Sequence, residues 1–136
     1  MADNILYYGD NLDILRRYIK DESVDLIYLD PPFNSNATYN VLFEDYAGGK
    51  SAAQLQAFKD TWSWPDAALT YEELTLRTDS VGVALRAFGK LLKQGGMLAY
   101  LTMMAPRLLA LRDVLKSTGS IYLHCDRSYA VAIIWV

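Results

Sequence analysis

Apolar and polar positions recur with different periods along the first thirty residues and predict a strand, a helix and a second strand. The short apolar run Ile5 to Tyr8 is typical of a strand that a Gly-Asp turn ends. The next apolar positions share one face of a helix, which we predict over roughly Leu12 to Lys20. Asp10 or Asn11 is placed to cap that helix. The second strand is predicted at Asp25 to Leu29.

A strand–helix–strand order of this kind predicts that the two strands are parallel and joined by a right-handed crossover. Ligands of parallel sheets bind outside the carboxyl ends of the strands. Asp10 and Asp30 each follow a predicted strand, so we expect both carboxylates at that edge. The expected fold class is α/β, with a mainly parallel sheet in a partial doubly wound arrangement.

The middle of the chain has weaker patterns. Asn34 to Gly49 is polar with scattered aromatic rings and predicts a long loop, a kind of segment that is usually functional or disordered. A short helix is expected at Ser51 to Phe58, with Ser51 as its cap. Thr70 to Glu73 has the form of a capping box. The helix predicted after it ends near Gly95 and has these apolar residues at helical spacing: Leu74, Val81, Leu85, Phe88 and Leu92.

Two interpretations fit Met97 to Lys116. We favour one helix that is kinked at Pro106. The alternative is a strand at Leu98 to Met103, followed by a helix in which the proline takes the first position. After this segment we predict a turn at Ser117 to Gly119 and a strand at Ser120 to His124.

The totals limit the class of protein. A chain of 136 residues, 52% of them hydrophobic, is expected to form one domain with an ample core. One cysteine and one histidine exclude an internal disulfide and argue against a metal site. Because we find no signal peptide and no apolar run of membrane-spanning length, we expect a cytoplasmic protein. The net charge of −3 argues against this chain gripping DNA by itself, because lysine and arginine supply most non-specific affinity for phosphates.

The exit of the second strand carries the most distinctive chemistry, in the residues Asp30-Pro31-Pro32-Phe33. Each proline fixes its own φ, removes a backbone donor and keeps the preceding residue out of the α region. The chain therefore leaves the sheet stiff and extended. A carboxylate, free carbonyls and an aromatic ring suit a planar group with an NH2, whose hydrogens the oxygens accept and on whose face the ring stacks. The plain alternative is a proline turn with an incidental aspartate.

These four residues resemble the catalytic tetrapeptide of the amino-group DNA methyltransferases. The longer run Asp30 to Phe43 is similar to the adenine-N6 members found in restriction–modification systems, as are Met103 to Leu108 and Thr118 to Asp126. The resemblance covers nearly all of the chain up to Asp126. It implies transfer of a methyl group from S-adenosylmethionine to an exocyclic base nitrogen, with DNA as the partner.

The resemblance also implies roles for individual residues. Asp30 would be the carboxylate that polarises the amino group, Pro31 would supply an accepting carbonyl, and Phe33 would stack on the base. Asp10 matches an acidic turn that lies close to the cofactor in the family. An ordinary helix N-cap is an equally good interpretation of Asp10, and one carboxylate can serve both purposes.

Two further residues are implied at the target base. Tyr39 would stack on the flipped base, with an ordinary loop tyrosine as the alternative. Asp126 would line the pocket that receives this base. We expect His124 to be a core histidine with a satisfied ring nitrogen, and Trp62 and Trp64 to be packing residues.

The sequence departs from the family in two places. Its eight glycines show no G-x-G spacing, whereas the family binds S-adenosylmethionine with a glycine-rich loop. In the group that this chain resembles, that loop lies C-terminal to the catalytic block and beyond the DNA-reading region. Arg127 to Val136 also does not resemble the continuation in the family. We therefore expect residues 1–136 to be a single partial catalytic domain that binds the cofactor weakly by itself.

Three functions stay open on this basis. The first is adenine-N6 methylation that requires the missing half, and the second is a non-catalytic remnant or assembly module. The third is methylation of another amino group, but cytosine-N4 enzymes more often have serine in place of Asp30 and protein-glutamine enzymes have asparagine. A homodimer or a complementing half is the expected partner, because the central strand and the β-branched tail Ala130 to Val136 offer segments that pair.

Overall fold

The computed structural model describes residues 4–31, 38–40, 56–59, 62–125 and 130. These residues form four helices and two separate pairs of strands. The fold class is α/β, as predicted, with a small parallel sheet. None of the described helices is long and apolar enough to cross a membrane.

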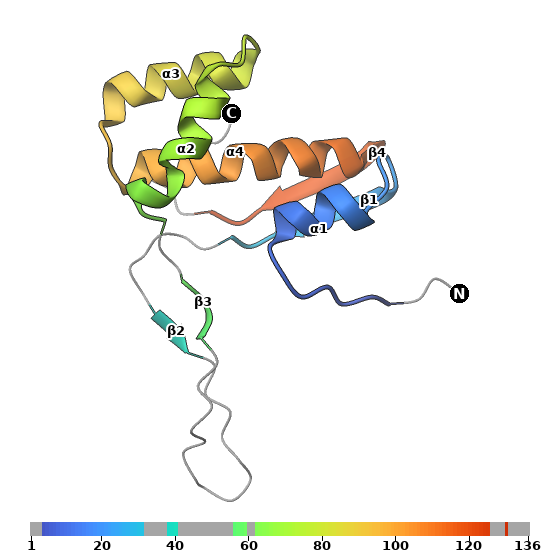
Figure 1. Cartoon of the computed structure of the whole chain (residues 1–136). Coiled ribbons are helices and arrows are strands. Elements are labelled where there is room, and N and C mark those ends of the chain that lie inside the picture. Colours follow the sequence, from blue (N-terminus) through green and yellow to red (C-terminus); the bar gives the residue numbers. More distant parts are fainter. Residues whose placement is uncertain (1–3, 32–37, 41–55, 60–61, 126–129, 131–136) are drawn as a thin grey trace, which may run out of the picture.

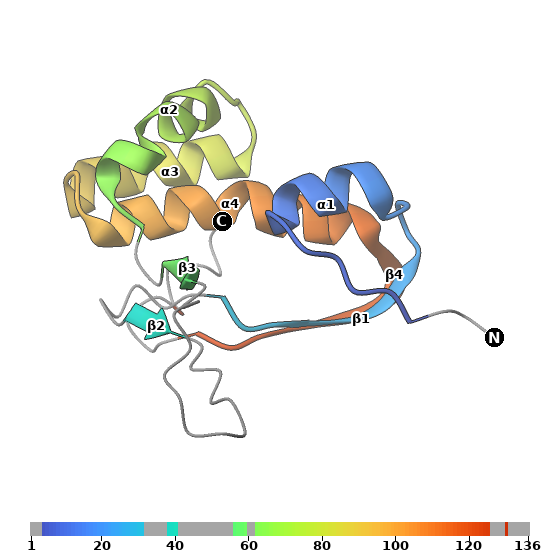
Figure 2. The same ribbon diagram turned by 60° about the horizontal axis from the view of Figure 1, so that its bottom comes forward.

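The elements form layers around one long central helix, α4. Figure 1 shows the parallel strands β1 and β4 beside α1 and α4. In Figure 2, α1 and α4 lie over one face of these strands, whereas α2 and α3 pack on the side of α4 away from the sheet. The bounds of these six elements are α1 Asn11–Tyr18, β1 Val24–Leu29, α2 Trp64–Thr75, α3 Ser80–Leu92, α4 Gly96–Val114 and β4 Leu115–Leu123.

The strands β1 and β4 run parallel, with Ile27 opposite Ile121 and Leu29 opposite Leu123. Near the start of the pair, two steps along β1 correspond to five steps along β4, which marks an irregularity in β4. The turn predicted at Ser117 to Gly119 is wrong, because β4 runs through these residues. The extra residues of β4 form an irregularity within the strand, and the chain does not turn back on itself there.

The strand predicted at Ile5 to Tyr8 is also wrong, since this stretch has no regular structure and is largely exposed. The central strand β1 has β4 as its parallel neighbour, and not this first segment. The Tyr7 ring stacks on Tyr18 of α1, with ring centroids 5.7 Å apart. This segment therefore contacts α1, and the edge of β1 pairs with β4.

The helix α1 confirms its prediction, including the cap. Oδ1 of Asp10 accepts a hydrogen bond from the backbone N–H of Leu12 at 2.8 Å. Leu15 of α1 and the nearby Ile19 pack against the core cluster that contains Ile27 of the sheet. The N-terminus of α1 is thereby fixed near the end of β1 at which Asp30 follows.

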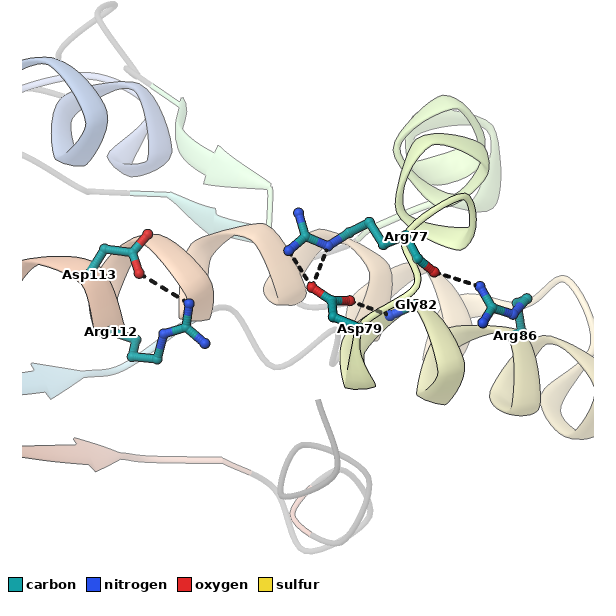
Figure 3. A network of polar contacts seen from close by, with 6 residues as sticks. All are labelled: Arg77, Asp79, Gly82, Arg86, Arg112 and Asp113. Atoms are coloured by element: carbon teal, nitrogen blue, oxygen red, sulfur yellow. Dashed lines mark hydrogen bonds and ion pairs between the residues drawn. The ribbon is translucent and has the colours of Figure 1, made fainter.

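The single helix predicted from Thr70 onward is wrong, because α2 begins earlier and ends before a break. Asp79 makes this break: Oδ1 accepts from the backbone N–H of Gly82 at 3.1 Å, and Oδ2 pairs with Arg77 (Figure 3). Arg86 of α3 donates to the Arg77 carbonyl at 2.8 Å. A Cβ at Gly82 would lie 2.2 Å from that carbonyl, so only glycine allows this approach.

The helix α4 is continuous through Pro106, which confirms the single helix of the favoured interpretation, whereas the kink at Pro106 stays a prediction. The alternative strand at Leu98 to Met103 is wrong. The apolar residues of α4 point to all sides because α1 and the sheet lie on one side and α2 and α3 on the other. The main core cluster joins α2, α3 and α4 through these buried residues: Leu74, Val81, Leu85, Tyr100, Leu101, Met104 and Ala105.

A second pair of strands, β2 (Thr38–Asn40) and β3 (Gln56–Lys59), is antiparallel. The long loop predicted over Asn34 to Gly49 thus contains a short strand. The helix predicted at Ser51 to Phe58 is wrong for residues 56–58, which belong to β3, and its remaining residues lie outside the described ones. Pairing between segments that are distant in the sequence has overridden local propensity here.

Candidate active site

The proline-rich exit of β1 meets the end of β4 at one edge of the sheet. Asp30 and Pro31 follow β1 directly, and Pro31 is buried. The backbone N–H of His124, the first residue after β4, donates to the carbonyl of Leu29 at 2.9 Å. This bond extends the pairing beyond both strands. Asp30 and His124 therefore lie together at the carboxyl edge, where parallel sheets bind ligands.

The side chains of Asp30 and His124 contact each other, with Nδ1 of the imidazole 3.1 Å from Oδ1 of the carboxylate. Both side chains are more than half exposed, at 58% for Asp30 and 61% for His124. The prediction that His124 is a core histidine is wrong, although its ring nitrogen does have a partner. Leu123, the last residue of β4, packs against the main core cluster, whereas the side chain of the next residue is exposed.

A pocket of about 290 Å³ lies beside the exit of β1. The turn before α1, the end of β1, the chain before α2 and the middle of α4 form its walls, through Gly9, Asp10, Asn11, Leu29, Pro31, Trp62, Met104 and Arg107. The pocket brings Asp10 together with Pro31, the residue that follows Asp30 at the end of β1. A mostly apolar lining with a few polar groups is typical of small-molecule sites.

Arg107 is the residue of this pocket to which the sequence analysis gave no role. Its side chain is only 7% exposed, and Nη2 lies 2.7 Å from Oδ2 of Asp10. Nε donates to Oδ1 of Asn11 at 2.9 Å, and Nη1 donates to the Met103 carbonyl at 2.8 Å. The guanidinium carbon lies 5.1 Å from the ring centroid of Trp62, within the range of a cation–π contact. Arg107 thus ties the start of α1 to α4.

A signal for Arg107 is present in the sequence. It is the only charged residue between Gly96 and Leu111. A lone charge inside an apolar segment requires a partner when the segment is buried. Local sequence patterns cannot identify that partner, because Asp10 lies 97 positions away in the sequence.

Asp10 confirms its interpretation as an N-cap and has a second contact, the ion pair with Arg107. Its side chain is 56% exposed, so the carboxylate remains open to the pocket and to solvent. Its place near a cofactor stays a prediction. Within the described residues, no group of histidine, cysteine, aspartate or glutamate side chains is arranged to hold a metal ion.

Several of the predicted site residues cannot be placed. Pro32, Phe33 and Asp126 lie outside the described residues. The backbone of Tyr39 belongs to β2, opposite Phe58, but the position of its side chain is not described. The structure therefore brings Asp10 and Pro31 of the predicted set to one pocket, where it adds Arg107, and it pairs Asp30 with His124.

Two curated relatives are similar to this chain over most of its length. The Mod subunit of the type III restriction-modification enzyme StyLTI from Salmonella typhimurium LT2 is 30% identical over 128 residues, which cover 92% of this chain and 16% of that subunit. The Mod subunit of the type III enzyme EcoPI from Escherichia phage P1 is 28% identical over 132 residues, which cover 92% and 17%. The chain spans about a sixth of the length of these relatives.

No solved structure matches the chain. Residues 24–135 match the family described as DNA methylase, the N6 and N4 methyltransferases. The match includes the exit of β1, all of α4 and the strand β4, so it contains both strands of the candidate edge. The chain therefore belongs to the DNA methylase family.

Proposed function

We propose that this chain carries the base-activating edge of an S-adenosylmethionine-dependent methyltransferase that acts on adenine N6 in DNA. The observation that carries the proposal is the exposed carboxylate of Asp30 at the end of the strand β1, directly before Pro31, which lines the pocket. Membership of the DNA methylase family and the similarity to two type III Mod subunits support the DNA context.

An adenine amino nitrogen is a poor nucleophile because its lone pair is delocalised into the ring. Hydrogen bonds from its two N–H groups to the Asp30 carboxylate and the Pro31 carbonyl favour a pyramidal nitrogen. They also place negative potential where positive charge develops during methyl transfer. Phe33 stacks on the base, and Pro32 keeps the exit stiff. These residues align the nitrogen for an in-line displacement.

The chemistry of the pocket fits part of the cofactor. Asp10 offers carboxylate oxygens to hydroxyl or amino donors, and the apolar walls suit a ring system. S-adenosylmethionine supplies an electrophilic methyl group when it is bound. The contribution of Asp10 to cofactor binding is limited, because one of its oxygens already accepts a hydrogen bond from the α1 backbone and the other accepts one from Arg107. Full cofactor affinity is proposed to need a glycine-rich loop from a longer enzyme.

The target adenine must leave the duplex before its amino group reaches this edge. We assign Tyr39 to stacking on the flipped base and Asp126 to the wall of the base pocket. The net charge of −3 gives this chain little attraction for phosphates. Most of the contacts with the DNA backbone are therefore assigned to other regions of a longer enzyme.

A second candidate function is an assembly module that keeps the fold but transfers no methyl group. The outer face of the sheet favours it, because Leu26, Tyr28 and Tyr122 are exposed there. A partner that covers this apolar face would explain their exposure without any chemistry at Asp30.

Methyl transfer in a complemented enzyme separates the two candidates. The chain is added to a StyLTI Mod subunit from which the matching segment has been deleted, together with duplex DNA and S-adenosylmethionine labelled in its methyl group. Label appearing on adenine N6 supports catalysis. Restored DNA binding by the Mod subunit without transfer supports the assembly module.

In the complemented enzyme, Asp30→Ala should remove about 3 kcal/mol of transition-state stabilisation, or roughly 100-fold in kcat/KM. Asp25→Ala is the matched control, since it removes a carboxylate at the opposite end of β1, where Asp25 pairs with Lys116 at 2.7 Å. The free energy of unfolding should change by less than about 1 kcal/mol in either variant, because both pairs are exposed. Transfer by Asp30→Ala within a few-fold of the unchanged chain would remove Asp30 from the mechanism.

A further inference from the structure

We propose that His124 is a positioning residue for Asp30: its ring holds one carboxylate oxygen, so that the other oxygen faces the amino group of the substrate base. The inference rests on the proposed function, in which Asp30 accepts an amino hydrogen. It adds a residue from the neighbouring strand to the motif that ends β1.

The backbone places His124 for this role. Leu29 lies opposite Leu123 at the ends of the two strands. The N–H of His124 then donates to the Leu29 carbonyl at 2.9 Å, which anchors His124 beside the residue that precedes Asp30. From this anchor Nδ1, the ring nitrogen nearest the backbone, reaches Oδ1 of Asp30 at 3.1 Å. The contact follows from the register of the strands.

The carboxylate of an aspartate turns easily about χ2, because this terminal torsion has broad, roughly two-fold minima. Pro31 restrains the backbone of Asp30 but not this torsion. Among the described residues, His124 is the one whose side chain is within hydrogen-bonding distance of the carboxylate. A hydrogen bond to Oδ1 fixes the plane of the carboxylate and leaves the lone pairs of Oδ2 for the incoming N–H.

The contact also specifies the protonation of the ring. An ionised carboxylate only accepts hydrogen bonds. The neutral imidazole must therefore carry its proton on Nδ1, since the partner of each ring nitrogen decides the tautomer. Because both side chains are exposed, the pair contributes little to stability. The consequence of the pair is the orientation of the Asp30 carboxylate. This distinguishes a positioning role of His124 from a role in stability.

The tautomer can be measured directly, because His124 is the only histidine of the chain. Nitrogen-15 NMR of the labelled chain at about pH 8.5, where an ordinary imidazole is neutral, distinguishes the two ring nitrogens. We expect the Nδ1–H tautomer to predominate. Asp30→Ala should lower the ratio of Nδ1–H to Nε2–H several-fold, whereas Asp25→Ala at the other end of β1 should leave it unchanged. Far-UV circular dichroism checks that both variants are folded.

A chain in which Nε2–H predominates, or in which Asp30→Ala leaves the ratio unchanged, would overturn the inference. Neither result depends on methyl transfer. If the complemented enzyme transfers no methyl group while the tautomer behaves as expected, the proposed function fails and the contact between His124 and Asp30 stands.

In an active complemented enzyme, two variants at His124 test the consequence for catalysis. His124→Asn places an amide N–H close to the position of Nδ1 and should keep kcat within about three-fold, because the hydrogen bond is charge-assisted in both cases. His124→Gln places its N–H further from the backbone and should lower kcat more than ten-fold. Equal kcat values for the two variants would show that His124 does not position Asp30.

Discussion

Oδ2 of Asp10 lies 2.7 Å from Nη2 of Arg107, although Asp10 is half exposed and Arg107 is almost completely buried. The two partners of this ion pair therefore depend on it to different degrees. Without Arg107, Asp10 still has solvent and its capping bond to Leu12. Without Asp10, Arg107 keeps only neutral acceptors around a buried charge.

This asymmetry predicts that the more exposed partner is the costlier one to remove. Asp10→Asn keeps a good N-cap but should cost about 2 kcal/mol, the typical value of a hydrogen bond to a charged group. Arg107→Met should cost less, because it removes the buried charge together with its need for a partner. Urea unfolding of both variants measures the two free energies.

Asp13→Asn is the control for this comparison, since Asp13 also pairs with an arginine, Arg17, on the same helix but in the open. It should cost no more than about 0.5 kcal/mol. A larger loss of stability in Arg107→Met than in Asp10→Asn would contradict the assignment of Arg107 as the dependent partner.

The break between α2 and α3 predicts a dependence of stability on pH. Hydrogen bonds from the Arg77 guanidinium and from the Gly82 backbone hold the pKa of Asp79 below its ordinary value of 3.8. A pKa that is lowered in the folded state adds stability above the ordinary value, and this stability is lost as the pH falls through the folded-state value. Asp79→Asn keeps the cap but does not titrate. The stability advantage of the unchanged chain over Asp79→Asn should therefore shrink between about pH 5 and about pH 2.

Urea midpoints of the two chains, measured across this range, test the pH prediction. An advantage that stays constant would show that the contacts of Asp79 do not depend on its charge. Asp66→Asn, at the start of α2, serves as a control for acid effects elsewhere in the helical layer.

The sequence predicted the edge of the sheet because its signals are local. A buried run followed by two prolines ends β1 at Leu29, and an apolar run ending in a polar residue locates the end of β4 near His124. Parallel strands that end at one edge bring the residues after them together. The contact between Asp30 and His124 is the structural result of these two local endings.

The neighbour of β1 could not be predicted, because Ile5 to Tyr8 is apolar enough to form a strand and competes with β4 as the expected neighbour. Its place beside β1 is taken by β4, whose paired positions Ile121 and Leu123 lie almost a hundred residues away from those in β1. The choice between the two segments depends on packing under α4, and a short stretch of sequence carries no information about that packing. For the same reason, local sequence patterns could not identify Asp10 as the partner of Arg107.

Cofactor binding by this chain is predicted to be weak. Calorimetric titration with S-adenosylmethionine should give no measurable heat at micromolar concentrations, because the sequence has no glycine-rich loop and both oxygens of Asp10 already accept hydrogen bonds. An intact type III Mod subunit is the positive control. Low-micromolar binding by this chain would show that the pocket between Asp10 and Pro31 suffices for the cofactor.

The outer face of the sheet predicts self-association. Leu26 and Tyr28 of β1 and Tyr122 of β4 are exposed on this face, and each strand has a second edge with no partner among the described residues. Unpaired edges beside apolar side chains are templates for pairing with another copy. Sedimentation velocity at micromolar concentrations should show a species heavier than the monomer, and Leu26→Lys should shift it toward the monomer. Leu91→Lys, at an even more exposed apolar position on α3, should leave the distribution unchanged. A single monomer at all concentrations would contradict this prediction, because exposed apolar side chains beside two unpaired strand edges would then not suffice for pairing.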